Sequence, residues 1–346
     1  MYTWLRTGLF QLPPEVAHGL AMESLKFGAH FRLPRLYAGC AVDDPFELMG
    51  LKFPNRVGLA AGLDKNGDYI DALGQLGFGH LEFGTVTPQP QPGNPRPRMF
   101  RLPDAQAIIN RMGFNNKGVD HLVEQLDPHR YAGIVGANIG KQKETPVEQA
   151  AEDYLVCLAK VYSHCDYVTV NISSPNTENL RQLQDTGPLA ELLGALVQAG
   201  KAHARKCGLR RPIVVKIAPD WDDKALRTSL ETIGASGIDG LVASNTTIAR
   251  DAVHGLPNAG ETGGLSGAPL LAPANHVLKI AREMLGPGFP IIGSGGIMRP
   301  EDALAKIAAG ADLIQLYTGF IYHGPALVRD SGRAIAEARD AEDNQS

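Results

Sequence analysis

The sequence has few cysteines, no excess of basic residues and no long apolar run, and each absence excludes a class of protein. The four cysteines, Cys40, Cys157, Cys165 and Cys207, form no C-x-x-C pair and have no histidines at zinc-ligand spacing. This argues against a zinc or iron–sulfur site and favours reduced, cytosolic thiols. A net charge of −4 over 346 residues leaves no basic field for DNA or RNA. No apolar run approaches the roughly 18 residues that span a bilayer.

Two further signatures are missing. No G-x-G-x-x-G with an acidic residue about 20 positions later is present, so a Rossmann-type dinucleotide site is not supported. No cleavable signal sequence precedes the two N-x-S/T matches, which begin at Asn171 and Asn245. We therefore expect these asparagines to be site residues and not glycosylation sites.

Short apolar runs followed by turn residues occur eight times along the chain. They cover residues 57–61, 81–84, 134–138, 167–171, 213–217, 241–244, 291–294 and 313–317. Segments with helical periodicity separate most of them, for example 68–76, 147–162, 189–206, 223–233 and 300–309. This alternation predicts an α/β protein with a (β/α)8 TIM barrel, which takes roughly 250 residues and leaves a remainder here. A doubly wound open sheet shares much of the pattern.

Nearly every predicted strand ends in a polar residue or glycine, at the end where barrel enzymes place their active sites. Lys65 and Lys216 are the most informative of these tips, since lysine is seldom placed where strands converge unless it meets an anion or a developing negative charge. The alternative is that polar residues simply end strands and that each lysine extends its amine to solvent.

Three glycine-rich loops, at residues 262–267, 293–296 and 317–319, predict a phosphate site. Barrels often bind phosphate with the loops after strands seven and eight, where glycine lets backbone N–H groups approach the oxygens closely. Glycine is also the default turn residue, so a single such loop would be weak support.

The first 40 residues read as two short helices, 2–9 and 14–29, with Trp4, Leu5 and Phe27 among their apolar residues and a small excess of basic ones. Such a pair suits a membrane interface that admits a lipid-soluble quinone. From the residues alone, packing against the barrel as ordinary core is the favoured alternative.

Six motifs in order resemble the class 2 dihydroorotate dehydrogenases, the membrane-associated, quinone-dependent class, over nearly the whole chain. They are AAGLDK (60–65), GTVTP (84–88), NRMGFNN (110–116), NISSPNT (171–177), TGGLSG (262–267) and IIGSGGI (291–297). The resemblance implies oxidation of dihydroorotate to orotate in de novo pyrimidine biosynthesis, with FMN as cofactor and ubiquinone or menaquinone as acceptor. It also implies a monomer bound peripherally to the cytoplasmic side of the cell membrane.

By the same resemblance Ser174 is the catalytic base, and Thr177 and the ring of Phe114 belong to the proton relay. Class 1 relatives have cysteine at the base position, so serine assigns class 2. A serine hydroxyl is a poor base unaided, and its proton must pass onward through neighbouring groups or water. The alternative is that Ser174-Pro175 is merely a turn.

The remaining site residues are also carried over from the family. The substrate set is Lys65, Asn110, Arg111, Met112, Gly113, Phe114, Asn171, Asn176, Asn245 and Thr246. The FMN set is Ala61, Gly62, Leu63, Asp64, Lys65, Thr85, Asn138, Asn171, Lys216, Ser244, Gly267, Gly296, Tyr317 and Thr318. The quinone set is His18 and Arg101. These sets divide the chain into a quinone-access extension (1–40), an FMN barrel (41–336) and a polar tail (337–346).

Two other functions fit the same residues. The nearest is an FMN barrel that acts on a different substrate, such as another pyrimidine. The second is a flavin-binding or scaffold barrel without turnover, which the presence of Lys65, Ser174 and Lys216 disfavours, because a pure binder needs no base beside an electron sink.

Overall fold

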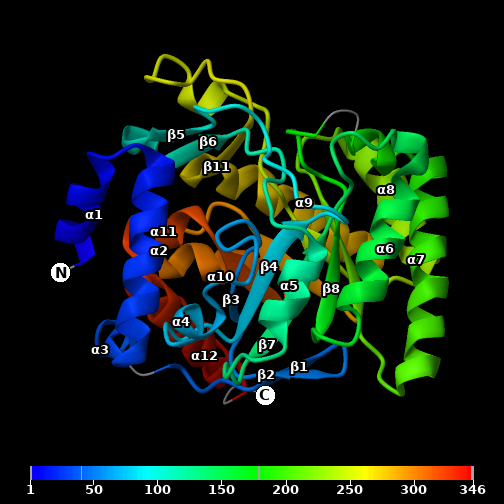
Figure 1. Ribbon diagram of the computed structural model, residues 1–346, viewed down its shortest axis with the longest axis horizontal. Coiled ribbons are helices and arrows are strands. Elements are labelled where there is room, and N and C mark those ends of the chain that lie inside the picture. Colours follow the sequence, from blue (N-terminus) through cyan, green and yellow to red (C-terminus); the bar gives the residue numbers. More distant parts are fainter. Residues whose placement is uncertain (1, 40, 178–179, 344–346) are drawn as a thin grey trace.

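A closed barrel of eight parallel strands forms the centre of the molecule, in a computed structural model that describes residues 2–39, 41–177 and 180–343 (Figure 1). Each barrel strand pairs with the next one in sequence, and the last pairs with the first. The strands are β3 (Val57–Leu59), β4 (His80–Val86), β7 (Ile134–Ile139), β8 (Tyr167–Asn171), β9 (Ile213–Ile217), β10 (Gly240–Ala243), β12 (Ile291–Ser294) and β13 (Leu313–Leu316). The predicted TIM barrel is confirmed, and each predicted strand corresponds to one of these.

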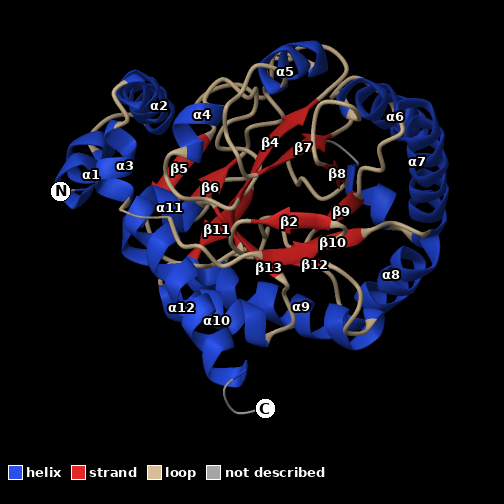
Figure 2. Cartoon of the chain, turned by 90° about the horizontal axis from the view of Figure 1, so that it is seen from below, coloured by secondary structure: helices blue, strands red, loops and turns tan. Residues whose placement is uncertain are grey.

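Helices follow the strands and enclose the barrel as a ring, which is clearest from below (Figure 2). They are α4 (Ile70–Gly74), α5 (Val119–Leu126), α6 (Ala150–Val161), α7 (Thr186–Cys207), α8 (Asp223–Ser236), α9 (Leu271–Leu285), α10 (Pro300–Ala308), α11 (Thr318–His323) and α12 (Pro325–Asp343). Local sequence sets their ends. At the start of α8, for example, Asp222 accepts the backbone N–H of Ala225, and the helix ends at Gly237 with φ +80°.

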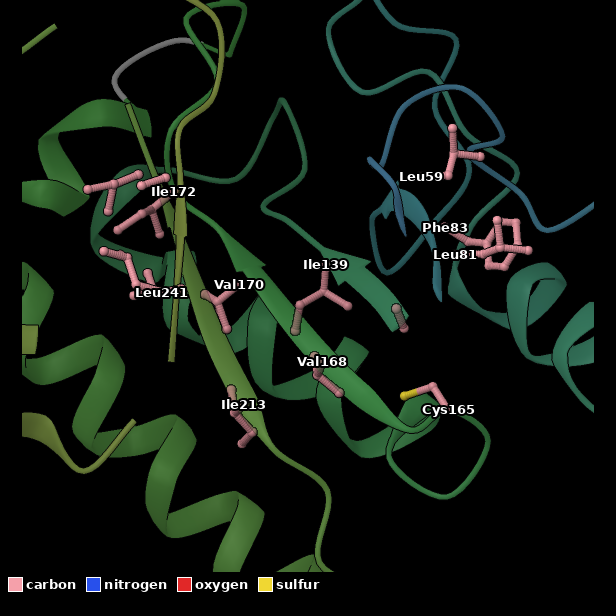
Figure 3. Packing of buried hydrophobic residues seen from close by; sticks show 14 of the residues in the cluster. Leu59, Leu81, Phe83, Ile139, Cys165, Val168, Val170, Ile172, Ile213 and Leu241 are labelled. Carbon is pink, nitrogen blue, oxygen red and sulfur yellow. The ribbon is translucent and has the colours of Figure 1, made fainter. Parts of the chain in front are cut away.

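Alternate residues of each strand enter different layers of the core. Val168, Val170, Ile213 and Leu241 belong to the large cluster that packs strands against helices (Figure 3). Val214 and Val242 belong instead to a smaller cluster at the base of the barrel. Because both faces of the strands are buried, the strands read as nearly continuous apolar runs.

Two small sheets lie at opposite ends of the barrel. The hairpin of β1 (Phe46–Leu48) and β2 (Leu51–Phe53) packs its apolar side chains into the cluster at the amino end. At the carboxyl end, β5 (Met99–Leu102), β6 (Ala107–Asn110) and β11 (Gly264–Gly267) form an antiparallel sheet. This sheet pairs segments about 150 residues apart, and it therefore brings Asn110 to the mouth of the barrel.

The helices α1 (Tyr2–Phe10), α2 (Pro14–His30) and α3 (Leu33–Ala38) lie outside the ring, on the opposite side from α7 (Figures 1 and 2). The first two match the predicted helices, and polar contacts join them to the barrel. Glu15 accepts two hydrogen bonds from Arg98, at 2.9 and 3.0 Å, and Glu23 accepts one from Tyr69 at 2.6 Å. The extension is thus a docked part of the structure.

The carboxyl-terminal segment, whose residues 337–346 form the predicted polar tail, is helical as far as Asp343. Residues 337–343 continue α12, which is held by the buried side chain of Ile335 and by an ion pair between Arg339 and the buried Asp44. Residues 344–346 of the predicted tail lie outside the described residues, as does Cys40. The other three cysteines are free thiols.

Candidate active site

A pocket opens at the carboxyl ends of the barrel strands, where β6 and β11 border it. Most of the residues assigned to substrate or flavin line it together. They are Ala61, Gly62, Lys65, Thr85, Asn110, Met112, Gly113, Phe114, Asn171, Ser174, Asn176, Lys216, Ser244, Asn245, Thr246, Gly267, Gly296, Tyr317 and Thr318.

Five residues of the catalytic, substrate and flavin sets do not line this pocket. The Arg111 guanidinium donates to Glu261 at 2.6 Å and turns away from the pocket. Thr177 is buried beside the base-bearing loop, and Asn138 is fully buried behind Thr85. Leu63 and Asp64 border a second cavity instead. The Asp64 carboxylate shapes its own loop by accepting the backbone N–H groups of residues 66, 68 and 69, and burial raises its pKa to about 6.

Several lining residues were not assigned from the sequence. They are Ala60, Pro175, Ser266, Leu270, Ser294, Gly295, Ile297, Gln315, Leu316 and Gly319. Gln315 could have been identified from the sequence, because it is the one polar residue inside the apolar strand β13. Ser266 lies within a glycine loop that was recognised only for its glycines.

On the glycine-rich side of the pocket, two backbone positions have no room for a side chain larger than that of glycine. Gly267 and Gly296 have φ values of +101° and +84°. A Cβ on Gly296 would lie 2.3 Å from both the backbone N and the Cα of Leu271. Beside them the Thr318 hydroxyl donates to the Ser266 hydroxyl at 2.8 Å. Glycine backbone and hydroxyls therefore line a surface of the kind that binds phosphate oxygens.

Gly296→Ala is expected to lower the flavin content of the purified protein severely, because the new methyl group displaces either its own loop or the start of α9. The readout is the ratio of flavin to protein absorbance, with thermal unfolding as a second measurement. Gly288→Ala is the matched control, since no heavy atom lies within 4 Å of a Cβ there. Equal flavin content in both variants would contradict this account of the loop.

A buried carboxylate organises the interior of the barrel below the pocket. Glu82 is fully buried and accepts four hydrogen bonds, from Asn138 (2.8 Å), Tyr167 (3.0 Å), Thr169 (2.9 Å) and Gln315 (2.8 Å). Burial and the adjacent carboxylate raise the pKa of Tyr167 well above its usual value, so its hydroxyl remains a donor. All four donors are thereby fixed in orientation.

This network continues upward to the pocket wall. Asn138 accepts from the Thr85 hydroxyl at 2.6 Å, and the same hydroxyl accepts from the Asn171 amide at 2.9 Å. Asn138 therefore does not line the pocket itself, but it orients Thr85 and, through Thr85, Asn171, which do line it. Glu82 stands at the lower end of this chain as the charged acceptor.

Lys216 enters the pocket from β9 and is 5% exposed. Burial lowers the pKa of its ammonium, while the negative charge of Glu82 acts in the opposite direction. A buried ammonium, in a low-dielectric environment, stabilises negative charge far better than a solvated ammonium does. Lys216 is thus suited to a group that gains negative charge during the reaction.

The wall beside Lys216, formed by the loops after β8 and β10, is rich in amides and carries the predicted base. Ser174 is 6% exposed, and its hydroxyl oxygen accepts the backbone N–H of Asn176 at 3.2 Å. The Asn245 amide donates to the Ser173 hydroxyl at 2.9 Å, which in turn donates to Asn171 at 3.0 Å. These hydrogen bonds orient amides that both donate and accept, as a ring with carbonyl and N–H groups requires.

Phe114 closes one side of this wall in an unusual conformation. Its φ of +51° lies in the left-handed region, and its carbonyl accepts from Asn116 at 2.7 Å and from Gln91 at 3.1 Å. A bulky residue persists in this region only when its surroundings hold it there. The ring of Phe114 is therefore placed at the pocket by its backbone.

Lys65 separates the pocket from the second cavity and borders both. Its ammonium donates to the carbonyl of Gly62 at 2.9 Å. Burial, followed by repulsion from Arg98, lowers its pKa to about 8. Gly62, Met112 and Tyr317 border both spaces as well, so the dividing wall is one side chain thick in places.

The second cavity lies between α1, α2 and the barrel, and both residues assigned to the quinone border it. Arg101 stacks 4.4 Å over the ring of Phe10 and donates to the carbonyl of Leu12 at 2.9 Å. Burial, with a further contribution from Lys65, lowers the pKa of His18 to about 4, so its ring is neutral at pH 7. The cavity leads from the apolar extension to the wall of the first pocket.

A parallel barrel with such a pocket defines a (β/α)8-barrel enzyme whose site combines a phosphate-type glycine cradle, buried lysines and an amide-rich wall. The family model described as dihydroorotate dehydrogenase matches residues 45–338. The chain belongs to the dihydroorotate dehydrogenase family.

Curated relatives agree over nearly their whole length. The proteins named dihydroorotate dehydrogenase (quinone) from Azotobacter vinelandii and Acidovorax sp. are 53% and 55% identical to this chain, with 98% of the chain covered in each case and 98% and 99% of the relatives. The protein of that name from Pseudomonas aeruginosa is 53% identical, with 97% of this chain and 98% of its own covered.

A solved structure agrees as well. The crystal structure of DHODH from Eimeria tenella in complex with ferulenol is 35% identical, has a TM-score of 0.85, and covers 95% of this chain and 92% of its own.

Proposed function

We infer that this protein oxidises dihydroorotate to orotate in pyrimidine biosynthesis and passes the electrons through a flavin to a quinone. The observation that carries this inference is the agreement, over 97–98% of the chain, with several curated dihydroorotate dehydrogenases (quinone). The pocket supports it, because the residues that such a reaction needs lie together there.

We propose FMN as the flavin. Two observations of the pocket fit it: the positive-φ glycines Gly267 and Gly296 bring backbone to the pocket wall beside the Ser266 and Thr318 hydroxyls, and the Oε1 atom of Gln315 is buried at the pocket without a partner among the described residues. A bound flavin supplies the two-electron acceptor for the reaction. Ser266 and Thr318 would hold the phosphate end, while Lys216 and Thr85 would hold the ring.

In the proposed mechanism, Ser174 removes the proton from one ring carbon of dihydroorotate while a hydride leaves the neighbouring carbon. The hydroxyl oxygen is fixed by the N–H of Asn176, and its own proton passes toward Thr177 or water. Asn110, Asn171, Asn176 and Asn245 orient the substrate ring. Lys65 balances the substrate carboxylate, and Phe114 excludes water from the base.

We propose that the second cavity is the quinone site, with His18 and Arg101 at its inner end. Arg101 offers guanidinium donors beside an apolar ring, which suits a quinone carbonyl and its ring. Lys65 borders both spaces, so quinone and flavin would lie on the two sides of one thin wall.

We propose that residues 1–40 bind the membrane surface peripherally, on its cytoplasmic side, and that residues 41–336 form the FMN barrel of a monomeric enzyme. Among the described residues, no helix is long and apolar enough to cross a membrane. The three N-terminal helices nevertheless expose large apolar side chains, including Trp4 (84%), Phe27 (69%) and Leu36 (77%). Apolar residues beside Arg and Lys are typical of an interfacial helix.

The double variant F27E/L36E is expected to lower binding to phosphatidylcholine–phosphatidylglycerol vesicles at least tenfold. Each large apolar side chain contributes about 1.5–3 kcal/mol when it is buried. Turnover with a water-soluble acceptor should not change, because neither residue borders either cavity. Leu209→Glu, an exposed leucine on the far side of the barrel, is the control. Equal vesicle binding by all three proteins would contradict the proposal.

The enzymatic proposal is tested by mixing the flavin-loaded protein with dihydroorotate without oxygen. Loss of the flavin absorbance with formation of one orotate per flavin is expected. Bleaching by another dihydropyrimidine, with none by dihydroorotate, would reassign the substrate.

A further inference from the structure

Arg181 lies outside the pocket, in the short 3₁₀ helix Leu180–Gln184, yet its guanidinium joins three loops of the site. Its Nε donates to the carbonyl of Ser173 at 3.1 Å. One terminal nitrogen donates to the Asp220 carboxylate at 2.8 Å, and the other donates to the carbonyl of Thr246 at 3.3 Å. These acceptors follow β8, β9 and β10, three neighbouring strands of the barrel.

Two of the three loops carry the reactive wall of the pocket. Ser173 immediately precedes the proposed base Ser174, and Thr246 follows Asn245. The two loops already touch inside the pocket, where the Asn245 amide donates to the Ser173 hydroxyl at 2.9 Å. Arg181 joins the same loops from behind, so the base-bearing loop is held from two sides.

Asp220 gives this arrangement a fixed anchor. Its side chain is 12% exposed, and besides Arg181 it accepts from the Thr247 hydroxyl and from the backbone N–H of Ile248 at 3.1 Å. The arginine charge is therefore balanced locally, and the loop after β10 is tied to the loop after β9. A charge-assisted pair in such a half-buried place is stronger than one on the open surface.

We propose that Arg181 is a positioning residue for the base: it sets the location of Ser174 by holding the Ser173 carbonyl against the loops after β9 and β10. This rests on the proposed role of Ser174. The planar guanidinium supplies directed donors on three nitrogens at once, whereas a lysine ammonium at the same place cannot reach all three acceptors. Displacement of a catalytic group by about 1 Å costs up to about 10²-fold in rate.

Arg181→Lys is therefore expected to slow the dihydroorotate-driven loss of flavin absorbance by roughly 10- to 100-fold. Flavin content should equal that of the unaltered protein, because none of the three acceptors belongs to the glycine-rich side of the pocket. Arg227→Lys is the matched control. Arg227 pairs with Glu283 at 3.0 Å between α8 and α9, away from the pocket, and this variant should react at the unaltered rate.

A double-variant comparison separates positioning from a general structural role. If Arg181 acts through Ser174, R181K should lower the rate in the unaltered protein but have little further effect on the residual rate of S174A. An unaltered rate in R181K, or an equal fold-loss in both backgrounds, would overturn the proposal. If R181K yields no flavin-bound protein, D220N replaces it in the same comparison, with a smaller loss expected and the same criterion.

The failure of this proposal is distinguishable from failure of the proposed function. If the unaltered protein does not react with dihydroorotate, the function itself is wrong. If it reacts and S174A reacts equally fast, the base assignment is wrong. Only when S174A is slow does the behaviour of R181K decide the role of Arg181.

Discussion

Replacement of Ser174 by alanine is expected to lower the rate of orotate formation by about two to four orders of magnitude, the usual contribution of a positioned general base. Flavin should remain bound. The hydroxyl lies on the amide-rich wall and belongs to none of the glycine loops, and the hydrogen bond that it accepts from Asn176 lies within its own loop. The loss should therefore appear in the chemical step and not in cofactor content.

Rapid mixing without oxygen measures this step, because loss of flavin absorbance by the substrate precedes any reaction with an acceptor. Ser174→Cys is the informative companion. A thiol loses its proton far below the pH at which a serine hydroxyl does, so this variant should retain more activity than S174A. A rate for S174A within a few fold of the unaltered rate would mean that another group accepts the proton.

Replacement of Lys216 by methionine is the second large effect. Methionine has nearly the same length without the charge, and the change removes a buried ammonium that faces the proposed flavin ring. Loss of one preorganised electrostatic group at a reacting centre typically costs about 10²–10³ in rate. The flavin reduction potential should fall, because the ammonium no longer stabilises the negative charge that reduction brings.

Stability separates this effect from simple unfolding. Burial opposes the charged ammonium more than Glu82 favours it, so K216M should leave the midpoint of thermal unfolding unchanged or higher. Lys201→Met, at an exposed position of α7, controls for the substitution itself. An unchanged flavin potential in K216M, together with an unchanged rate, would place Lys216 outside the reaction.

The barrel could be predicted because each of its strands is encoded by a few consecutive residues. Each strand is buried on both faces and therefore reads as a short apolar run, and each ends in polar residues or glycine where the site must form. For this reason the sequence alone singles out Lys65 and Lys216. Both line the pocket, Lys216 buried and Lys65 half-buried.

Features that depend on distant pairing were not predictable in this way. The sheet of β5, β6 and β11 pairs Asn110 with Gly264. Nothing in the sequence of either segment indicates which segment it pairs with. Arg181 is likewise a surface-type residue by sequence, and only the arrangement of three loops gives it a role. The cavity at His18 and Arg101 was expected only from the family resemblance.

Glu82 is an intermediate case. The sequence itself shows that Glu82 is unusual, because it is a charged residue between Leu81 and Phe83 in an apolar strand. Such a residue must be solvated by its neighbours if the strand is buried. Its four donors come from three other strands, β7, β8 and β13, and could not be identified from the sequence.

The central claim is that this enzyme oxidises dihydroorotate and delivers the electrons to a quinone. The most direct test is orotate formation from dihydroorotate by the flavin-loaded protein, with a short-chain ubiquinone, fumarate or NAD supplied in parallel. Rapid turnover with the quinone alone is predicted. Turnover with fumarate or NAD but not with the quinone would contradict the claim and leave the second cavity without its proposed ligand.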